Sequence, residues 1–291
     1  MVPLQSSPKP GDRSVRLSDG DFRRLSRFIQ ETCGIKISDS KKTMLETRLL
    51  KRVKSLGLGS FADYCAYLFD AGDDRGEVVR MIDLVTTNKT DFFREPDHFA
   101  YLLQHVLPAW VQLQPDHGGR KFHVWSAGCS TGEEAYTLAM VLNEFAEGNT
   151  GFDFQVLASD ISVRALEAAR LAVYAEERAE PVPIHLKRKY FLRSKDRSAR
   201  QVRVIPALRR KVHFARLNFM ADDFGMVEKF DAIFCRNVII YFDKGTQERL
   251  LQKLCCQLSP HGYVFLGHSE TLGGLDVRLS MVYPTVYRKL P

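Results

Sequence analysis

The chain has 291 residues, of which 45% are hydrophobic and 26% are charged, as expected for a folded protein of about two domains. Its apolar stretches are interrupted by charge or proline and stay below the ~18 apolar residues that suggest a membrane span. Residues 1–17 are polar, rich in Pro and Ser, and lack the apolar segment of a signal peptide. We therefore expect a disordered tail on a cytoplasmic protein.

The net charge of +7 is unevenly distributed along the chain. Residues 184–216 contain twelve Lys/Arg and a single acid, and residues 36–54 contain seven Lys/Arg and two acids. Such patches indicate an acidic partner, which composition alone leaves open between nucleic acid and protein. The six cysteines show neither CxxC nor zinc-ligand spacing, so we expect buried free thiols and no metal site.

Residues 18–86 are typical of a small all-helical domain. Ser18 is a suitable N-cap for a helix over 19–33, and further helices are expected over 39–56, 61–69 and 77–86. In the second helix the apolar residues lie on one stripe. A separate, basic face carries Arg48, Lys51 and Arg52, which we interpret as a surface that recognises the substrate.

Residues 87–120 are expected to form a junction, and strands and helices alternate from residue 121 onward. We expect buried strands over 122–126, 154–159, 230–235 and 263–267, with helices over 132–146, 162–174 and 244–258. This order predicts an α/β fold with an open, mostly parallel, Rossmann-like sheet. A small β-subdomain is expected over 184–216, and an edge hairpin over 279–282 and 285–289.

The first candidate site follows the strand 122–126. Gly128 and Gly132 lie where a backbone can approach a ligand closely, and a helix begins beside them. Glu133 and Glu134 at this helix start would repel a phosphate but accept an ammonium or sulfonium group. The alternative is a helix start with acids that merely favour the helix dipole.

Two further candidates follow other strands. Asp160 ends the next strand, where an acid can accept both ribose hydroxyls or can cap the following helix instead. Arg236 and Asn237 lie at the end of a central strand, on the rim where open α/β sheets bind ligands. A buried arginine is costly unless it is paired, and Asp231 or Asp243 could provide a purely structural ion pair.

The segment 86–96, which reads Thr-Thr-Asn-Lys-Thr-Asp-Phe-Phe-Arg-Glu-Pro, joins polar side chains to paired aromatics. Alone it could be an ordinary linker, although domain junctions are preferred ligand sites. Together with Ser130-Thr-Gly-Glu-Glu134, Ala158-Ser-Asp-Ile161, 230–242 and Gly267-His-Ser-Glu270, it resembles the chemotaxis receptor methyltransferases of the CheR type. The resemblance extends over nearly the whole chain from residue 18.

This resemblance implies a class I methyltransferase sheet that binds S-adenosylmethionine, releases S-adenosylhomocysteine and uses no metal. Glu134 would face the methionyl amino group and Asp160 the ribose. Tyr241 would lie near the transferred methyl and Arg94 would line the cofactor pocket, and we expect both to orient the reacting groups. The remaining positions implied for the cofactor pocket are Asn88, Thr90, Gly128, Asn218, Phe219, Arg236 and Asn237.

The implied substrates are glutamate side chains on the cytoplasmic domain of chemoreceptors, read through an acidic helical surface. The implied β-subdomain departs from the pattern, because its loop 194–201 lacks the glycines that dock a receptor tether in some members. A nucleic-acid methyltransferase is the main alternative, but Arg236-Asn-Val-Ile lacks an Asn-Pro-Pro-Tyr-like strand end. A binding module without activity is the third class.

Overall fold

The structure is a computed structural model that describes residues 15–70, 75–113 and 120–290. The first 14 residues of the expected tail lie outside this range. The backbone contacts divide the chain into two compact units. The smaller unit extends up to Glu31 and over Ile37–Val85, and the larger unit comprises Thr32–Lys36 and the chain from Thr86 onward.

The smaller unit is built from helices, as predicted. Its elements are α1 (Asp19–Cys33), a 3-10 turn (Asp39–Lys41), α2 (Lys42–Ser55), α3 (Phe61–Asp70) and α4 (Arg75–Val85). Ser18 caps α1 as expected, since the Asp21 backbone N–H donates to its hydroxyl at 3.1 Å. The apolar stripe of α2 is buried at Leu45, Leu49 and Val53, so the helical periodicity correctly identified the face that makes the core.

The larger unit contains a seven-stranded sheet in the order β6-β2-β1-β7-β8-β10-β9. Five neighbouring strands are parallel, and the last two add an antiparallel edge. The predicted C-terminal hairpin is therefore confirmed. The strands are β1 (Phe122–Ala127), β2 (Phe154–Asp160), β6 (Val212–Arg216), β7 (Phe230–Cys235), β8 (Leu258–Leu266), β9 (Leu279–Tyr283) and β10 (Val286–Lys289).

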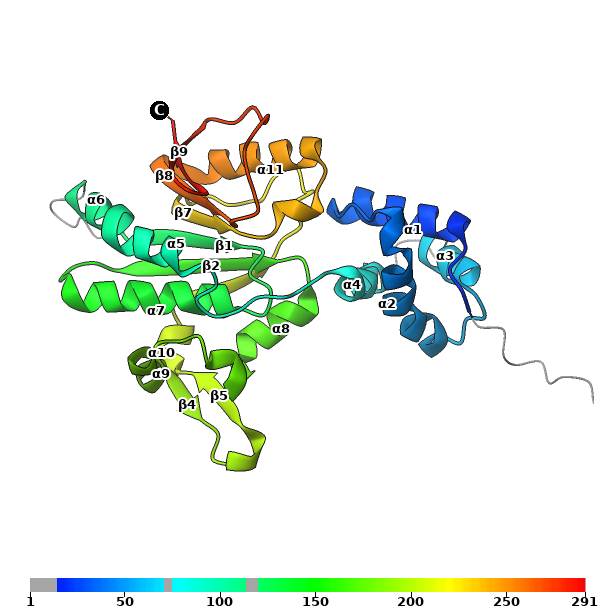
Figure 1. The fold of residues 1–291 in the computed structure, drawn as a ribbon, viewed down its shortest axis with the longest axis horizontal. Coiled ribbons are helices and arrows are strands. Elements are labelled where there is room, and N and C mark those ends of the chain that lie inside the picture. Colours follow the sequence, from blue (N-terminus) through cyan, green and yellow to red (C-terminus); the bar gives the residue numbers. More distant parts are fainter. Residues whose placement is uncertain (1–14, 71–74, 114–119, 291) are drawn as a thin grey trace, which may run out of the picture. The chain divides into compact units, whose positions relative to one another are not determined.

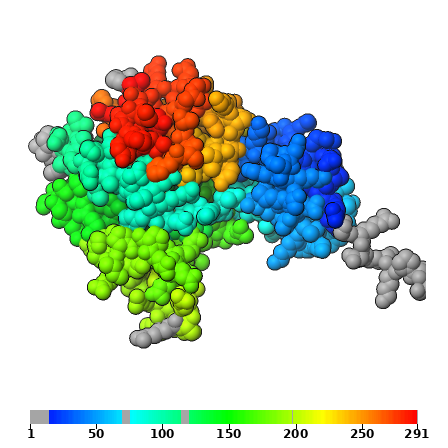
Figure 2. Space-filling view, in the orientation of Figure 1, coloured from blue at the N-terminus to red at the C-terminus, as the bar shows by residue number. Residues whose placement is uncertain are grey.

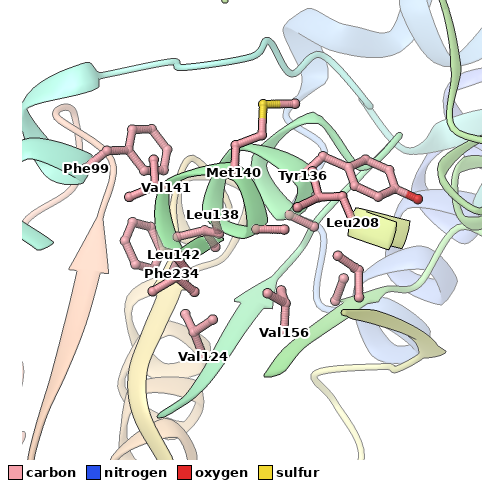
Figure 3. Packing of buried hydrophobic residues seen from close by; sticks show 14 of the residues in the cluster. Phe99, Val124, Tyr136, Leu138, Met140, Val141, Leu142, Val156, Leu208 and Phe234 are labelled. Atoms are coloured by element: carbon pink, nitrogen blue, oxygen red, sulfur yellow. The ribbon is translucent and has the colours of Figure 1, made fainter. Parts of the chain in front are cut away.

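Helices cover both faces of this sheet (Figure 1). Val124 packs into the cluster that includes α7 (Glu133–Gly148) and α8 (Val163–Leu171), whereas Trp125 packs into the cluster of α11 (Lys244–Gln257). Neighbouring residues of a strand point to opposite faces, so both sides of β1 are buried. Figure 3 shows the α7 side of this packing.

The segment 87–120 is not a separate junction, because its described residues belong to the larger unit. It forms α5 (Pro96–Tyr101), a π-helical turn (Leu102–Val106) and α6 (Leu107–Gln112). Phe99, Leu102 and Trp110 are buried in the α7 cluster. Their burial removes apolar surface from water, which explains why this segment packs on the sheet rather than bridging two bodies.

The small antiparallel sheet is present, but its bounds differ from the expected 184–216. It consists of β3 (Val173–Ala175), β5 (Gln201–Val204) and β4 (Phe191–Arg193), with α9 (Ile184–Tyr190) and α10 (Pro206–Arg209) beside it. Strand β3 precedes the expected range, and β6 pairs with β2 in the main sheet instead. Figure 2 shows the corresponding yellow-green region standing out from the rest of the larger unit.

Candidate functional site

The turn after β1 requires glycine at two positions. Gly128 and Gly132 have φ angles of 88° and 94°, in the left-handed region that favours glycine. A Cβ on Gly128 would lie 2.5 Å from Val238 Cγ2, and one on Gly132 would lie 2.9 Å from Ala169 Cβ. The glycines therefore let the turn pass close to the neighbouring elements, and α7 begins directly after them.

Asp160 braces this turn from the end of β2. Its carboxylate accepts the backbone N–H of Ser130 at 2.8 Å and that of Ser162 at 2.9 Å. Ser162 in turn caps α8 by accepting the Ala165 backbone N–H at 3.1 Å. These hydrogen bonds support the alternative interpretation, in which Asp160 organises the start of the next helix. The expected contact of Asp160 with ribose stays a prediction.

Glu134 is a buried carboxylate held by two donors. The Ser126 hydroxyl donates to one oxygen at 2.6 Å, and Arg236 Nε donates to the other at 2.8 Å. Its neighbour Glu133 is also buried, with hydrogen bonds from the Thr131 hydroxyl and the Arg178 guanidinium. Burial raises the pKa of Glu133 above its ordinary value. The two adjacent acids thus have separate partners, and Glu134 alone connects to the end of β7.

Arg236 pairs with neither of the aspartates suggested by sequence. Its side chain is 2% exposed and binds Glu134, with Glu95 Oε2 3.6 Å from its Nη1 atom. Asp231 instead pairs with Arg120 at 2.6 Å, and Asp243 accepts the Thr246 backbone N–H to cap α11. The alternative of an ion pair between Arg236 and Asp231 or Asp243 is therefore not found, because each aspartate has a partner of its own.

His98 on α5 completes the environment of this arginine, and no sequence pattern had singled it out. Arg236 Nη1 donates to His98 Nδ1 at 3.0 Å. Since the Thr285 hydroxyl donates to the Pro284 carbonyl, it accepts from His98 Nε2 at 2.8 Å. Burial and the Arg236 charge lower the pKa of His98 to about 4. The ring is therefore neutral and accepts through Nδ1.

Asn237 follows in a left-handed conformation, with a φ of 58°. The buried carboxylate of Glu270 holds it there by accepting four backbone N–H groups, from Asn237, Val238, Ile240 and Gly267, at 2.6–3.3 Å. A Cβ on Gly267 would lie 2.4 Å from Asn237 Nδ2. Glu270 therefore fixes the backbone of the segment that leads to Tyr241. The sequence motif 267–270 contributed to the family resemblance, but it did not predict this structural role of Glu270.

Asn88 and Thr90 lie against the glycine turn. The Ser130 hydroxyl donates to the Asn88 carbonyl at 3.0 Å, and Asn88 Nδ2 donates to the Ser162 hydroxyl at 3.4 Å. The Thr90 carbonyl accepts from Arg178 at 2.6 Å. The structure thus brings the first part of the 86–96 motif to the turn through backbone groups as well as side chains.

Arg94 and Tyr241 are both half-buried. Arg94 Nη1 donates to the Lys89 carbonyl at 3.3 Å. Tyr241 ends a 3-10 turn (Ile239–Tyr241), and its hydroxyl has no hydrogen bond to any other residue that the structure describes.

Asn218 and Phe219 lie in the loop after β6. The Asn218 side-chain oxygen accepts the Met220 backbone N–H at 3.0 Å, which shapes the turn. Phe219 packs with Trp125 at a ring-centroid distance of 6.4 Å. Their expected contact with adenine therefore stays a prediction.

In the smaller unit, the three basic residues of α2 are not equivalent. Arg52 Nη2 lies 2.5 Å from Glu77, which is 2% exposed and also accepts from the Tyr64 hydroxyl at 3.0 Å. Arg48 donates to the Val85 carbonyl at 2.5 Å, and Lys51 is exposed. Arg52 is therefore joined to a buried carboxylate of the core, whereas Lys51 is exposed, and the role of this face in recognition stays a prediction.

One group in the described part of the chain has metal-ligand chemistry: Glu95, His98 and His268 have ligand atoms within 4.8 Å of one another. Both ring nitrogens of His98 are already engaged, and the cationic Arg236 lies beside it. A cation would have to displace these bonds and face that charge, so the group fits an ion-pair network better. Within residues 15–70, 75–113 and 120–290, no helix is long and apolar enough to span a bilayer.

Comparison with known proteins gives matches over both units. Residues 88–287 match the family described as CheR methyltransferase, SAM binding domain, and residues 20–86 match CheR methyltransferase, all-alpha domain. The chain is 39% identical to the chemotaxis protein methyltransferase of Escherichia coli over 94% of this chain and 92% of that protein. It is 37% identical to the chemotaxis protein methyltransferase of Borreliella burgdorferi, over 95% and 96%.

Proposed function

Because the chain belongs to the CheR methyltransferase family, we propose that it transfers methyl groups from S-adenosylmethionine to glutamate side chains of bacterial chemoreceptors. The products are glutamate methyl esters and S-adenosylhomocysteine, and the reaction serves chemotaxis adaptation. It takes place in the cytoplasm, on the cytoplasmic domain of the receptor. The observation that carries the proposal is the pair of buried carboxylates, Glu134 and Asp160, at the two sides of the glycine turn.

The chemistry of this turn suits the proposed cofactor. Glu134 receives hydrogen bonds on both oxygens, one of them from the guanidinium of Arg236. A carboxylate at this position attracts the ammonium group of S-adenosylmethionine and disfavours phosphate. Because an ionised carboxylate has about four acceptor sites, Asp160 can brace the turn and still accept ribose hydroxyls.

Arg236 is then a residue that positions Glu134 rather than one that touches the cofactor directly. Its guanidinium is surrounded by Glu134, His98 and Glu95, and its carbon centre lies 5.1 Å from the Phe99 ring centroid. An arginine held from several sides loses little further entropy on binding, so it can keep Glu134 in one orientation. Asn88, Thr90, Gly128 and Asn237 complete the proposed pocket wall, with Asn218 and Phe219 beside the adenine.

The proposed reaction needs no general base. The substrate carboxylate has a reference pKa near 4.3 and is already ionised at neutral pH. The bound cofactor supplies a methyl group activated on a sulfonium ion. Attack of an anion on a cation neutralises charge, so a site that excludes water and aligns the reactants favours it. We assign this alignment to Arg94 and Tyr241, whose polar ends have few partners.

Recognition of the receptor is assigned to the exposed basic side chains of α2. Lys51 and Lys54 are exposed, whereas Arg52 is committed to Glu77 and Arg48 to the Val85 carbonyl. Exchange of Lys51 and Lys54 for Glu should slow receptor methylation and weaken its salt dependence without changing cofactor affinity. An unchanged methylation rate over a range of salt concentrations would make this face an ordinary solvated surface.

The proposed function is tested by transfer of tritiated methyl from S-adenosylmethionine to membranes that contain chemoreceptors. Base-labile tritium on the receptor is expected, as for a methyl ester, with none on RNA in a parallel reaction. Label on RNA would instead support a nucleic-acid methyltransferase. Cofactor binding without transfer to either substrate would support a binding module.

A further inference from the structure

A second cavity of about 380 Å³ lies away from the glycine turn, at the β6 side of the large sheet. Three arginines line it: Arg170 from α8, Arg209 from the end of α10, and Arg210 directly after it. Its other walls include Tyr136 of α7 and Val212 and Phe214 of β6. The cavity therefore combines a concentration of positive charge with an apolar and aromatic surface.

The positive charge of this cavity is not balanced by nearby acids. None of its lining residues is acidic, and none of the three arginines has an ion pair with another described residue. By contrast, Arg52, Arg178 and Arg236 of this chain each pair with a buried glutamate. Grouped arginines without carboxylate partners are a typical feature of sites that bind phosphate or another polyvalent anion.

Two details indicate that these arginines form a prepared site. Arg170 Nη2 donates to the Phe214 carbonyl at 3.1 Å, which restrains its guanidinium beside β6. The Nε atom of Arg209 is buried and has no hydrogen-bond partner in the described part of the chain. Because this N–H is buried, a ligand meets Arg209 through its terminal nitrogens, and no acceptor among the described residues uses the Nε atom.

The apolar side of the cavity is equally well defined. Figure 3 shows Tyr136 projecting from α7 on the side where Leu208 of α10 lies. The Tyr136 hydroxyl donates to the Ala169 carbonyl at 2.9 Å, so its ring is held in place. Tyr136 and Phe214 have ring centroids 5.8 Å apart. Tyr136 is 1% exposed, so the half-buried Phe214 supplies the accessible part of this apolar wall.

We propose that this cavity is a second ligand site, which binds a small phosphate ester with an aromatic or similarly apolar portion. The phosphate lies among Arg170, Arg209 and Arg210, and the apolar portion lies against Phe214. The site is separate from the proposed methyl-transfer site. It is nevertheless linked to it, because Tyr136 and Glu134 share the first turns of α7, and Gly132 packs against Ala169.

The test uses the full chain and two probes, phenyl phosphate and inorganic phosphate, in calorimetric titrations at low salt. Phenyl phosphate is expected to bind at one saturable site, more tightly than inorganic phosphate, with an affinity that falls as salt is added. It resembles no part of S-adenosylmethionine, and saturating S-adenosylhomocysteine should not displace it. Absence of saturable binding, or equal affinity for the two probes, would overturn the proposal.

Matched variants locate the site. Arg209→Gln is expected to weaken phenyl phosphate binding at least ~10-fold, the usual effect of losing one charge-assisted hydrogen bond. Arg188→Gln removes the same charge from the exposed face of α9, outside the cavity, and should change the affinity less than about twofold. If the half-buried Arg209 proves necessary for folding, Arg210→Gln, at an exposed position, tests the same pocket. Equal effects of the cavity and α9 variants would reduce the binding to nonspecific surface charge.

Discussion

Buried glutamates are held by arginines in both units, and the Arg52–Glu77 and Arg236–Glu134 pairs have different surroundings. In the smaller unit, Glu77 binds Arg52 and the Tyr64 hydroxyl, joining three helices of one core. In the larger unit, Glu134 binds Arg236 and Ser126 at the carboxyl ends of parallel strands, beside a glycine turn. A buried ion pair is therefore no evidence of function by itself. The Arg236–Glu134 pair is a candidate site because it lies at the carboxyl ends of parallel strands.

The largest expected effect on stability is that of Arg52→Ala, which removes the arginine of the pair in the smaller unit. This change leaves the buried Glu77 with only Arg80, 4.0 Å away, as a cationic partner, and removal of one partner of a buried pair costs about 3 kcal/mol of stability. The smaller unit should lose protection of α2 and α4 amides in hydrogen exchange. Both tryptophans, Trp110 and Trp125, lie in the larger unit, so fluorescence-detected unfolding and cofactor affinity should change little.

The neighbouring Lys51→Ala is the matched control for this variant. Lys51 is exposed on the same helix, so its loss should change stability by less than about 0.5 kcal/mol. Equal loss of amide protection in both variants would show that the Arg52–Glu77 pair contributes no more than surface charge.

The second prediction concerns Glu134→Gln, which keeps the side-chain shape but removes the charge. Affinity for S-adenosylhomocysteine should fall by about 1.5–3 kcal/mol, the usual range for a hydrogen bond to a charged group. The larger unit should also become less stable, because Arg236 loses its main counter-charge. Calorimetry with the cofactor product measures the first effect. Unchanged affinity would make Glu134 a structural residue like Glu77.

Tyr241→Phe tests whether the Tyr241 hydroxyl contributes to the methyl-transfer step. The ring and its packing are kept and only the hydroxyl is lost, so cofactor affinity should hold while the single-turnover rate of methyl transfer falls. We expect a reduction of ~10-fold, consistent with the loss of one aligned hydrogen bond in a closed site. An unimpaired rate at saturating cofactor would leave Tyr241 with a packing role only.

The last expected effect is the acid sensitivity caused by His98, which is absent at neutral pH. Its folded pKa of about 4 lies below the ordinary histidine value of 6.5, so the unfolded chain takes up the proton more readily. The stability of the larger unit should be unaffected by this group above pH 6.5. As the pH falls from 6.5 toward 4, stability should drop by at most about 1.4 kcal/mol per pH unit.

His98→Gln should reduce this slope in fluorescence-detected unfolding between pH 6.5 and 5. The charged or titratable groups that face His98 are Arg236, Glu95, Asp97 and His268. His213→Gln, at an exposed position on β6, is the control and should keep the wild-type slope. Identical slopes in all three proteins would show that His98 does not sense acid in this range.

Local patterns were sufficient to predict much of the fold. The strand and helix order, the cap at Ser18, the buried stripe of α2 and the C-terminal hairpin all depend on residues close in sequence. The glycine turn and the two acids that follow it could also be predicted, because left-handed backbone positions and helix starts have strong residue preferences. These features are determined by the sequence by itself.

The partners within the candidate site were decided only by the tertiary structure. Arg236 and Glu134 are 102 positions apart, and His98 reaches Thr285 across 187. Asp231 and Asp243 were nearer in sequence, yet packing directs them to Arg120 and to the start of α11. Burial makes each charge require a partner, but the stacking of parallel strands and their helices determines which partner is within reach.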